Sequence, residues 1–173
     1  NICKCLMGRP FNMSHDVLIV TALAGFARSF LMDDIAILQS MGYVVHCAAN
    51  ANHPGADDVV NFLKKKNVIF HQVDFSSSKP LSKNTLQSFF ELQKISSEYD
   101  FCLVHCHTPI AGAICRLVFE KQRRWKGVSV IYTTHGFYFH KKSSRKTWLI
   151  FRSIEDWMSR FTDVMITINH EDF

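Results

Sequence analysis

Short, nearly continuous apolar runs alternate with helix-length amphipathic segments along most of the chain. The runs are "DVLIVTA" (16–22), "YVVHCAA" (43–49), "NVIFHQV" (67–73), "FCLVHCH" (101–107), "VSVIYTT" (128–134) and "DVMITIN" (163–169). Strands that are covered on both faces of a sheet read as such continuous runs, rather than as alternating apolar and polar positions. The pattern therefore predicts six buried β-strands.

The segments between the runs have the spacing of helices. They cover residues 27–42, 56–66, 85–99, a stretch that opens at 108–109, and 147–161. A helix after each strand is typical of a parallel sheet, and right-handed crossovers then give a single-domain, doubly wound, Rossmann-like α/β fold. Residues 1–12 show no clear period, so we expect an N-terminal extension there and a domain that covers residues 13–173.

Several helix ends carry recognisable start and stop signals. Gly42 follows the first helical segment and fits the C′ position that ends a helix. The segment "ADDVVNFLKKK" has acids in its first turn and lysines in its last, which suits the helix dipole. Thr108 and Pro109 fit the N-cap and N1 positions of the helix that follows the fourth strand.

The composition indicates an ordinary soluble protein in a reducing compartment. The residues are 47% apolar and 20% charged. The longest uninterrupted apolar stretch, residues 17–26, is about half as long as a bilayer span, and no secretory signal is evident. The six cysteines form no CxxC pair, and four of them lie in apolar stretches. We therefore expect free thiols and a cytoplasmic location.

The positive charge is concentrated in one segment. The net charge is +5, but residues 121–146 hold eight Lys/Arg and no acid, which leaves twelve Lys/Arg against fifteen acids elsewhere. This distribution argues against general nucleic-acid affinity and favours one anionic ligand or membrane surface. A solvated helix end followed by a loop explains the same charge, and both interpretations remain open.

Histidines follow two neighbouring strands of the predicted sheet. His105 and His107 end the fourth strand, and His135 follows the fifth. Ligands of doubly wound sheets bind beyond the carboxyl ends of the strands, so these imidazoles should meet where a ligand binds. They suit a three-histidine zinc site, although no acidic residue stands at these strand ends. Ordinary strand-end histidines are the alternative.

Other familiar active-site motifs are missing from the sequence. Cys106 should point away from its two histidine neighbours, and there is no G-x-S-x-G elbow, G-x-G-x-x-G loop or Walker A lysine. The first loop, "TALAGFARS", offers only Gly25 as a point of close approach. These features argue against a nucleophilic hydrolase and a dinucleotide-dependent dehydrogenase.

The helix that opens at Thr108 is the remaining candidate for ligand binding. Its free N–H groups can receive a phosphate or a sugar hydroxyl, and Gly112 in its first turns permits close approach. Close packing of helix against sheet explains the same glycine. Gly136 allows a sharp turn that directs His135 into a cleft.

Four segments together resemble a known family. They are "VLIVTA…RSFLMDDIAILQSMGYVVHCAAN", "HCHTPIAGAICRL", "VIYTTHGFYFH" and "IEDWMSRFTDVMITINHEDF", and in this order they resemble the N-terminal domain of family 4 glycosyltransferases, in particular bacterial enzymes of capsule and exopolysaccharide synthesis. The resemblance covers roughly residues 16–173 and implies one half of a GT-B fold. In that fold the N-terminal half binds the acceptor and the C-terminal half binds the nucleotide-sugar.

The resemblance also implies the chemistry and the residues that carry it. Transfer would retain the anomeric configuration and use no metal and no cofactor besides the nucleotide-sugar co-substrate. His135 would be the catalytic polar group, and the substrate-binding residues would be His107, Thr108, Pro109, Gly112 and Gly136, with Gly25 in the first loop. The donor-binding domain is expected beyond Phe173, so this chain alone should be inactive.

The resemblance further implies partners. Such enzymes act on lipid-linked acceptors at the inner face of the plasma membrane, and residues 137–151 interleave aromatic and basic side chains as interfacial segments do. We therefore expect a peripheral membrane surface there. The alternative function is a non-catalytic binding or assembly module that pairs with a separate donor-binding chain.

Overall fold

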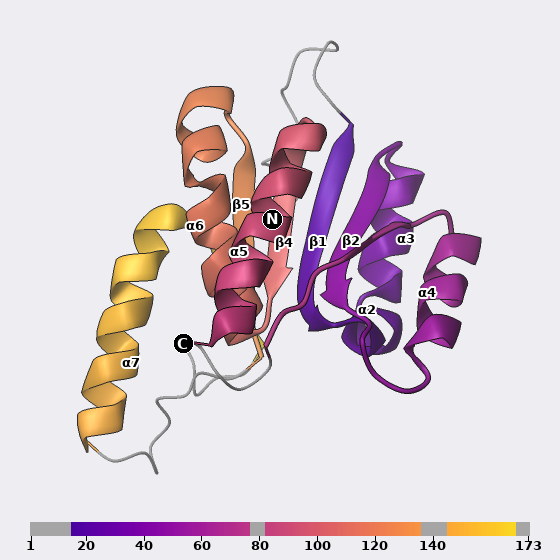
Figure 1. Ribbon diagram of the computed structural model, residues 1–173. Helices are drawn as coiled ribbons and strands as arrows, with labels where there is room; N and C mark the ends of the chain where they lie inside the picture. The colour runs from indigo at the N-terminus through magenta and orange to yellow at the C-terminus, as the bar shows by residue number, and fades with distance from the viewer. Residues whose placement is uncertain (1–14, 77–81, 136–144, 169–173) are drawn as a thin grey trace.

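A computed structural model describes residues 15–76, 82–135 and 145–168 of the chain (Figure 1). Its centre is a six-stranded parallel sheet in the order β3-β2-β1-β4-β5-β6. The strands are β1 (Asp16–Leu23), β2 (Val44–Asn50), β3 (Ile69–Gln72), β4 (Phe101–His107), β5 (Ser129–Thr134) and β6 (Val164–Thr167). This strand order and the parallel pairing confirm the predicted doubly wound, Rossmann-like fold.

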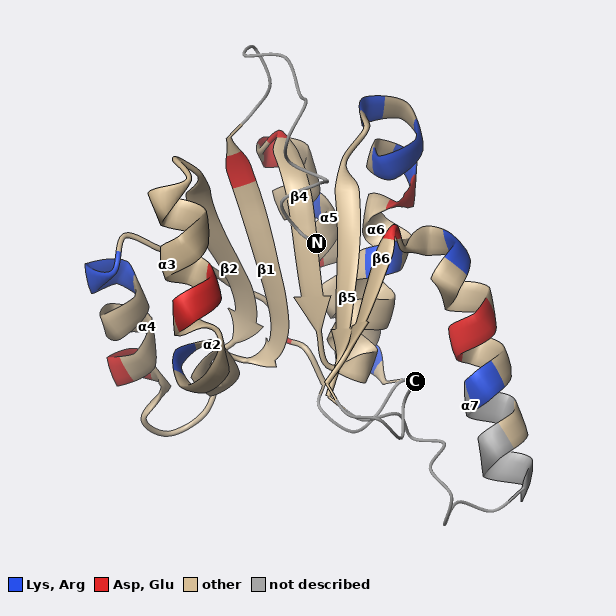
Figure 2. Ribbon diagram, turned by 180° about the vertical axis from the view of Figure 1, so that it is seen from behind, with Lys and Arg blue, Asp and Glu red and all other residues tan. Residues whose placement is uncertain are grey.

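Helices cover both faces of the sheet. They are α2 (Ala24–Phe30), α3 (Met32–Ser40), α4 (Ala56–Lys65), α5 (Lys83–Glu98), α6 (Pro109–Lys126), α7 (Arg145–Met158) and the short 3-10 helix η1 (Ser159–Phe161). Figure 1 shows α5 and α6 in front of the sheet, with α7 beyond α6, and Figure 2 shows α2, α3 and α4 on the opposite face.

Two hydrophobic clusters hold these layers together. Leu18, Val104 and Tyr132 face α5 and α6, while Val17, Leu103 and Ile131 face α2, α3 and α4. Neighbouring residues of one strand thus enter different clusters, because side chains alternate across a strand. Asp16 is the only Asp, Glu, Lys or Arg within the six strands, as the almost uniform colour of the strands in Figure 2 illustrates. This explains the continuous apolar runs in the sequence.

All six predicted strands are confirmed, but the first predicted helix is wrong in two respects. Helix α2 begins at Ala24, directly after β1, inside the segment that we predicted to be a loop. The helical segment is also divided at Leu31, which ends α2 and starts α3 with φ −118° and ψ 9°. Leu31 is buried, with Ala24 and Ala27, in the cluster on this face of the sheet. Burial of these side chains accounts for the early helix start, since packing of an apolar face overrides local loop signals.

The helix caps lie at the predicted positions, but one of them lacks the predicted side-chain hydrogen bond. Gly42 adopts φ +87°, as the C′ position of a helix requires. Thr108 and Pro109 occupy the N-cap and N1 positions of α6, but the Thr108 side chain does not cap this helix. A cap that we did not predict is Ser82, whose hydroxyl accepts a hydrogen bond from Thr85 N at 3.2 Å and starts α5.

Helix α7 is tied to α6 by a buried ion pair. The Arg116 side chain is fully buried, and its guanidinium donates to both carboxylate oxygens of Glu155 at 2.9 and 3.3 Å. The guanidinium also lies over the Tyr132 ring, 4.2 Å from the ring centroid, and donates through Nε to Gly112 O. This single side chain therefore connects α6, α7 and β5.

Gly112 packs directly against the sheet. A Cβ at this position would lie 2.8 Å from Cε2 of Tyr132, whose side chain is fully buried. We expect Gly112→Ala to lower the free energy of unfolding by about 1–3 kcal/mol, the usual cost of overpacking a core. Gly25→Ala is the matched control, because no atom lies within 4 Å of that Cβ position. Urea titration of both variants tests this, and an unchanged Gly112→Ala protein would contradict it.

Candidate functional site

The carboxyl ends of β4 and β5 bring two histidines together, as predicted. The strands are neighbours in register, with His107 opposite Thr133. His107 Nδ1 lies 3.3 Å from Nε2 of His135, the first residue after β5, so the two imidazoles share a hydrogen bond. His107 is almost fully buried, and His135 is exposed. The pair therefore runs from the protein interior to its surface.

His105 continues this line of imidazoles into the interior. Its ring centroid lies 4.1 Å from that of His107, and its Nε2 lies 2.8 Å from the hydroxyl oxygen of Thr133. Cys106 points to the other face of the sheet, as predicted, and its thiol donates to Ile131 O at 3.3 Å. His105 is thus a strand residue whose imidazole is hydrogen-bonded to Thr133, and Cys106 belongs to the hydrophobic core.

Burial keeps these imidazoles neutral. Burial, followed by the charges of His105 and His135, lowers the pKa of His107 from 6.5 to about 2. Burial, followed by the charge of His135, lowers the pKa of His105 to about 4. Burial also lowers the pKa of His135. At neutral pH the site is therefore a polar but uncharged edge that exchanges hydrogen bonds rather than ion pairs.

Phe26 is a site residue that sequence reasoning missed. Its ring centroid lies 4.8 Å from that of His135 in an edge-to-face arrangement and 6.0 Å from that of His107. One helical turn later, Phe30 packs on Phe26 with centroids 4.9 Å apart and remains 67% exposed. The i, i+4 spacing of these two aromatics is the signal in the sequence, since it places both rings on one side of α2.

Thr108 joins the carboxyl ends of β1 and β4. Its hydroxyl accepts a hydrogen bond from Ala22 N at 3.2 Å, in place of capping α6. Thr108 has φ +64° and ψ 141°, a conformation that a β-branched residue rarely adopts. Strain of this kind costs about 1–3 kcal/mol and is typical of functional sites.

The structure separates the predicted site residues into groups. His107, Thr108 and Pro109 are consecutive at the carboxyl edge, and His135 joins them through His107. Gly112 faces Tyr132 in the core, which gives it a packing role. Gly25 lies in the first turn of α2, where an added Cβ would point into open space. Gly136 lies outside the described residues.

The zinc-site interpretation finds no support in the geometry. Within residues 15–76, 82–135 and 145–168, no group of three His, Cys, Asp or Glu side chains is placed to hold a metal ion. His107 directs Nδ1 at His135 Nε2, and His105 directs Nε2 at the Thr133 hydroxyl. The described part of the chain also contains no helix long and apolar enough to span a membrane.

A second histidine pair lies outside this site. Nδ1 of His46 on β2 is 2.8 Å from Nε2 of His71 on β3, and the two rings stack with an interplanar angle of 8°. Asp16 lies 3.6 Å from the other nitrogen of His46. Burial, followed by the charge of His46, lowers the pKa of His71 to about 4.

The lowered pKa values of the buried histidines predict a loss of stability in mild acid. In the unfolded chain these imidazoles titrate near 6.5, whereas His71 and His105 titrate at about 4 in the folded protein. The unfolded state therefore binds more protons between these values, and the free energy of unfolding falls as the pH drops from about 6.5 to about 4. Urea midpoints measured across this window check the expectation, and His71→Gln should flatten the slope. A constant midpoint would contradict it.

Comparisons with known proteins identify the family. Residues 35–172 match Glycosyltransferase Family 4. The chain is 31% identical over 163 residues to the Bacillus subtilis (strain 168) protein named "Putative glycosyltransferase EpsD", and this match covers 93% of the chain and 39% of that protein. The fold resembles that of Acinetobacter baumannii MurG, with a TM-score of 0.59 at 15% identity, over 91% of the chain and 42% of MurG. The chain thus spans about two fifths of these relatives, and it belongs to Glycosyltransferase Family 4.

Proposed function

We propose that the chain is the acceptor-binding half of a retaining glycosyltransferase, which transfers a sugar from a nucleotide-sugar to a lipid-linked polysaccharide acceptor. The observation that carries this proposal is the neutral His107–His135 pair at the carboxyl edge of a family 4 domain. A neutral polar edge suits hydroxyl groups and phosphate esters, which exchange hydrogen bonds with imidazole. The family match and the similarity to EpsD support a role in sugar transfer.

The proposed roles follow the geometry of the edge. His135 is exposed at the surface end of the pair and hydrogen-bonds the transferred sugar or the leaving phosphate, while His107 supports it from the interior. Thr108 and Pro109 shape the floor between β1 and β4, and Gly25 leaves open space beside the first turn of α2. Phe30 offers an exposed apolar ring, and sugar rings stack on such faces. The exopolysaccharide or capsule context is part of this proposal.

The experiment that tests the proposal is a transfer assay on the full-length protein. Purified protein is incubated with nucleotide-sugars and a lipid extract, and NMR of the product reads the anomeric configuration. Transfer with retention, without added metal, supports the proposal. Lack of transfer, together with capture of a separate donor-binding chain, would favour the alternative of a non-catalytic assembly module.

The proposed assignment of donor binding to a second domain can be tested by measuring nucleotide-sugar binding to this chain alone. The donor is proposed to bind mainly to a second domain, so calorimetry of residues 1–173 with nucleotide-sugars should show weak binding or none. Micromolar binding would contradict the acceptor-side assignment.

Membrane contact is proposed for residues 137–151. Residues 137–144 lie outside the described part of the chain, and of the α7 side chains up to residue 151 only Leu149 is described, at 58% exposed. Further along α7, Ile154 and Trp157 are 45% and 48% exposed. Aromatic and aliphatic side chains beside basic ones suit an anionic membrane surface, and a peripheral location at its cytoplasmic face follows. Sedimentation with anionic liposomes should carry down the protein, and no dependence on anionic lipid would contradict this.

A further inference from the structure

The two ring nitrogens of His107 have different surroundings. Nδ1 lies 3.3 Å from Nε2 of His135 and shares a hydrogen bond with it. Nε2 is buried and has no hydrogen-bond partner among the described residues. Besides His135, the rings of His105 and Phe26 lie near His107, with centroids at 4.1 and 6.0 Å. The imidazole is therefore satisfied on one side only.

This asymmetry selects one tautomer of His107. A neutral imidazole carries its proton on one nitrogen and a lone pair on the other. A proton on Nε2 would bury a donor without an acceptor, which is rarer and more costly in proteins than an unfilled acceptor. A proton on Nδ1 forms a hydrogen bond, because it points at Nε2 of His135. Protonation of both nitrogens is disfavoured by burial, which keeps the ring neutral.

The tautomer of His107 then fixes that of His135. When His107 Nδ1–H donates, His135 Nε2 must accept, and the proton of a neutral His135 is left on Nδ1. An imidazole free in water prefers the opposite tautomer, with its proton on Nε2. His135 Nδ1 forms no hydrogen bond with another described residue. The rings of Phe26 and His135 pack in an edge-to-face arrangement with centroids 4.8 Å apart.

We propose that His107 is a positioning residue that holds His135 as the Nδ1–H tautomer, so that His135 presents a hydrogen-bond donor to a substrate oxygen. The part of this inference that concerns substrate rests on the proposed function. The oxygen belongs to a sugar hydroxyl or to a phosphate, since both accept from a neutral N–H. His135 then stabilises charge on that oxygen and does not remove the proton of the acceptor hydroxyl.

The tautomers can be read directly by NMR. The chain is prepared with ¹⁵N-labelled histidine, and two-bond ¹H–¹⁵N correlations at neutral pH report which nitrogen of each ring is protonated. We expect a protonated Nδ1 on both His107 and His135. A protonated Nε2 on His135 would overturn the proposal. Because no substrate is present, failure of the glycosyltransferase assignment would leave this result unchanged, and the two ideas can fail separately.

A variant tests whether His107 is the cause. His107→Phe keeps a ring of similar size and removes the donor, so the Nδ1–H signal of His135 should be lost in favour of Nε2–H. His15→Phe is the matched control, because His15 precedes β1 at the opposite edge of the sheet and should leave His135 unchanged. A folded His107→Phe protein that retains the Nδ1–H form of His135 would overturn the role of His107.

The wild-type protein decides the question if His107→Phe does not fold. The proton shared by the two imidazoles should show one-bond coupling to His107 Nδ1 and a weaker coupling across the hydrogen bond to His135 Nε2. One-bond coupling to His135 Nε2 instead would reverse the direction of donation and overturn the proposal.

Discussion

Glu155→Ala is expected to lower the free energy of unfolding by about 3–5 kcal/mol, the usual result when one partner of a buried ion pair is removed. The Arg116 side chain is fully buried, and Glu155 is 16% exposed and bonds the guanidinium through both carboxylate oxygens. Without the carboxylate the guanidinium remains in the core, and its remaining partners among the described residues are Gly112 O and the Tyr132 ring. Urea titration followed by circular dichroism measures the loss.

Two further variants separate the buried charge from general damage to a helix. Glu120→Ala removes the partner of Arg124, which is 61% exposed, and should cost at most about 1 kcal/mol. The double variant Arg116→Met/Glu155→Leu should recover most of the stability, because apolar replacements of a buried pair are often neutral or stabilising. A Glu155→Ala protein no less stable than Glu120→Ala would contradict the assignment.

Under the proposed function, His135→Ala is expected to reduce kcat of the full-length protein by about 10²–10³-fold, the effect of removing one preorganised donor from a developing charge. KM for the acceptor should change much less, because a bond that strengthens in the transition state contributes mainly to kcat. His135 is exposed at the carboxyl edge, so its removal leaves the core intact. Steady-state assays with saturating donor measure both constants.

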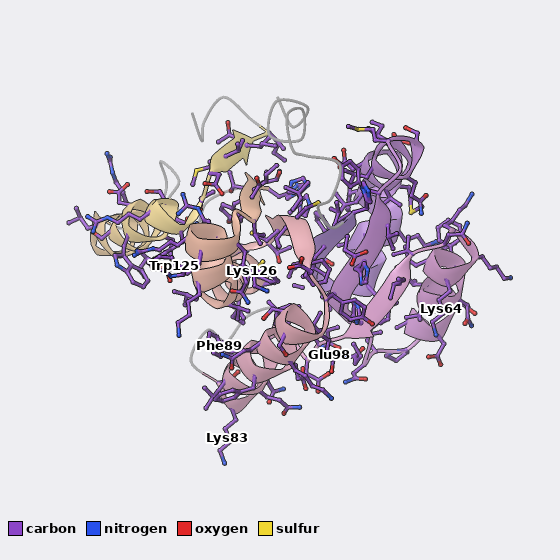
Figure 3. All side chains as sticks on the ribbon, turned by 90° about the horizontal axis from the view of Figure 1, so that it is seen from above. Lys64, Lys83, Phe89, Glu98, Trp125 and Lys126 are labelled. Carbon is purple, nitrogen blue, oxygen red and sulfur yellow. The ribbon has the colours of Figure 1, made fainter. Side chains whose placement is uncertain are left out.

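His15→Ala provides the matched control for this prediction. His15 is also an exposed histidine next to a strand, but it lies at the amino edge of the sheet, where β1 begins. Figure 3 shows this amino edge, with Glu98, Trp125 and Lys126 from the C-terminal ends of α5 and α6. His15→Ala should retain full activity. If His135→Ala kept kcat within about threefold, a direct role in transfer would be refuted.

The strands could be predicted from the sequence because burial on both faces leaves an unbroken apolar signal. Helix α2 could not, since Gly25 and the small residues around it read locally as a loop. What forms the helix is the burial of Ala24, Ala27 and Leu31 beneath it, which depends on tertiary packing. In α5, Leu86 and Phe90 are apolar, yet they are 61% and 58% exposed, so apolar identity alone does not show which side of this helix packs on the sheet.

The meeting of His107 and His135 followed from topology, because neighbouring parallel strands end at one edge. The direction of their hydrogen bond depends on which nitrogen is buried, and no sequence pattern records this. Phe26 was missed because its segment was predicted to be a loop. From the sequence, Gly112 could serve either close approach of a ligand or close packing of a helix on the sheet. The position of the Tyr132 ring favours packing.

The strand order also determines when the sheet can be completed during synthesis. β1 lies between β2 and β4, but β4 begins only at Phe101. β1, β2 and β3 can therefore pair as soon as Gln72 has left the ribosome, while the other edge of β1 stays open. An apolar open edge pairs readily with other chains, and N-terminal segments fold first. The nascent chain therefore exposes the apolar edge of β1 until Phe101–His107 emerges and pairs with it.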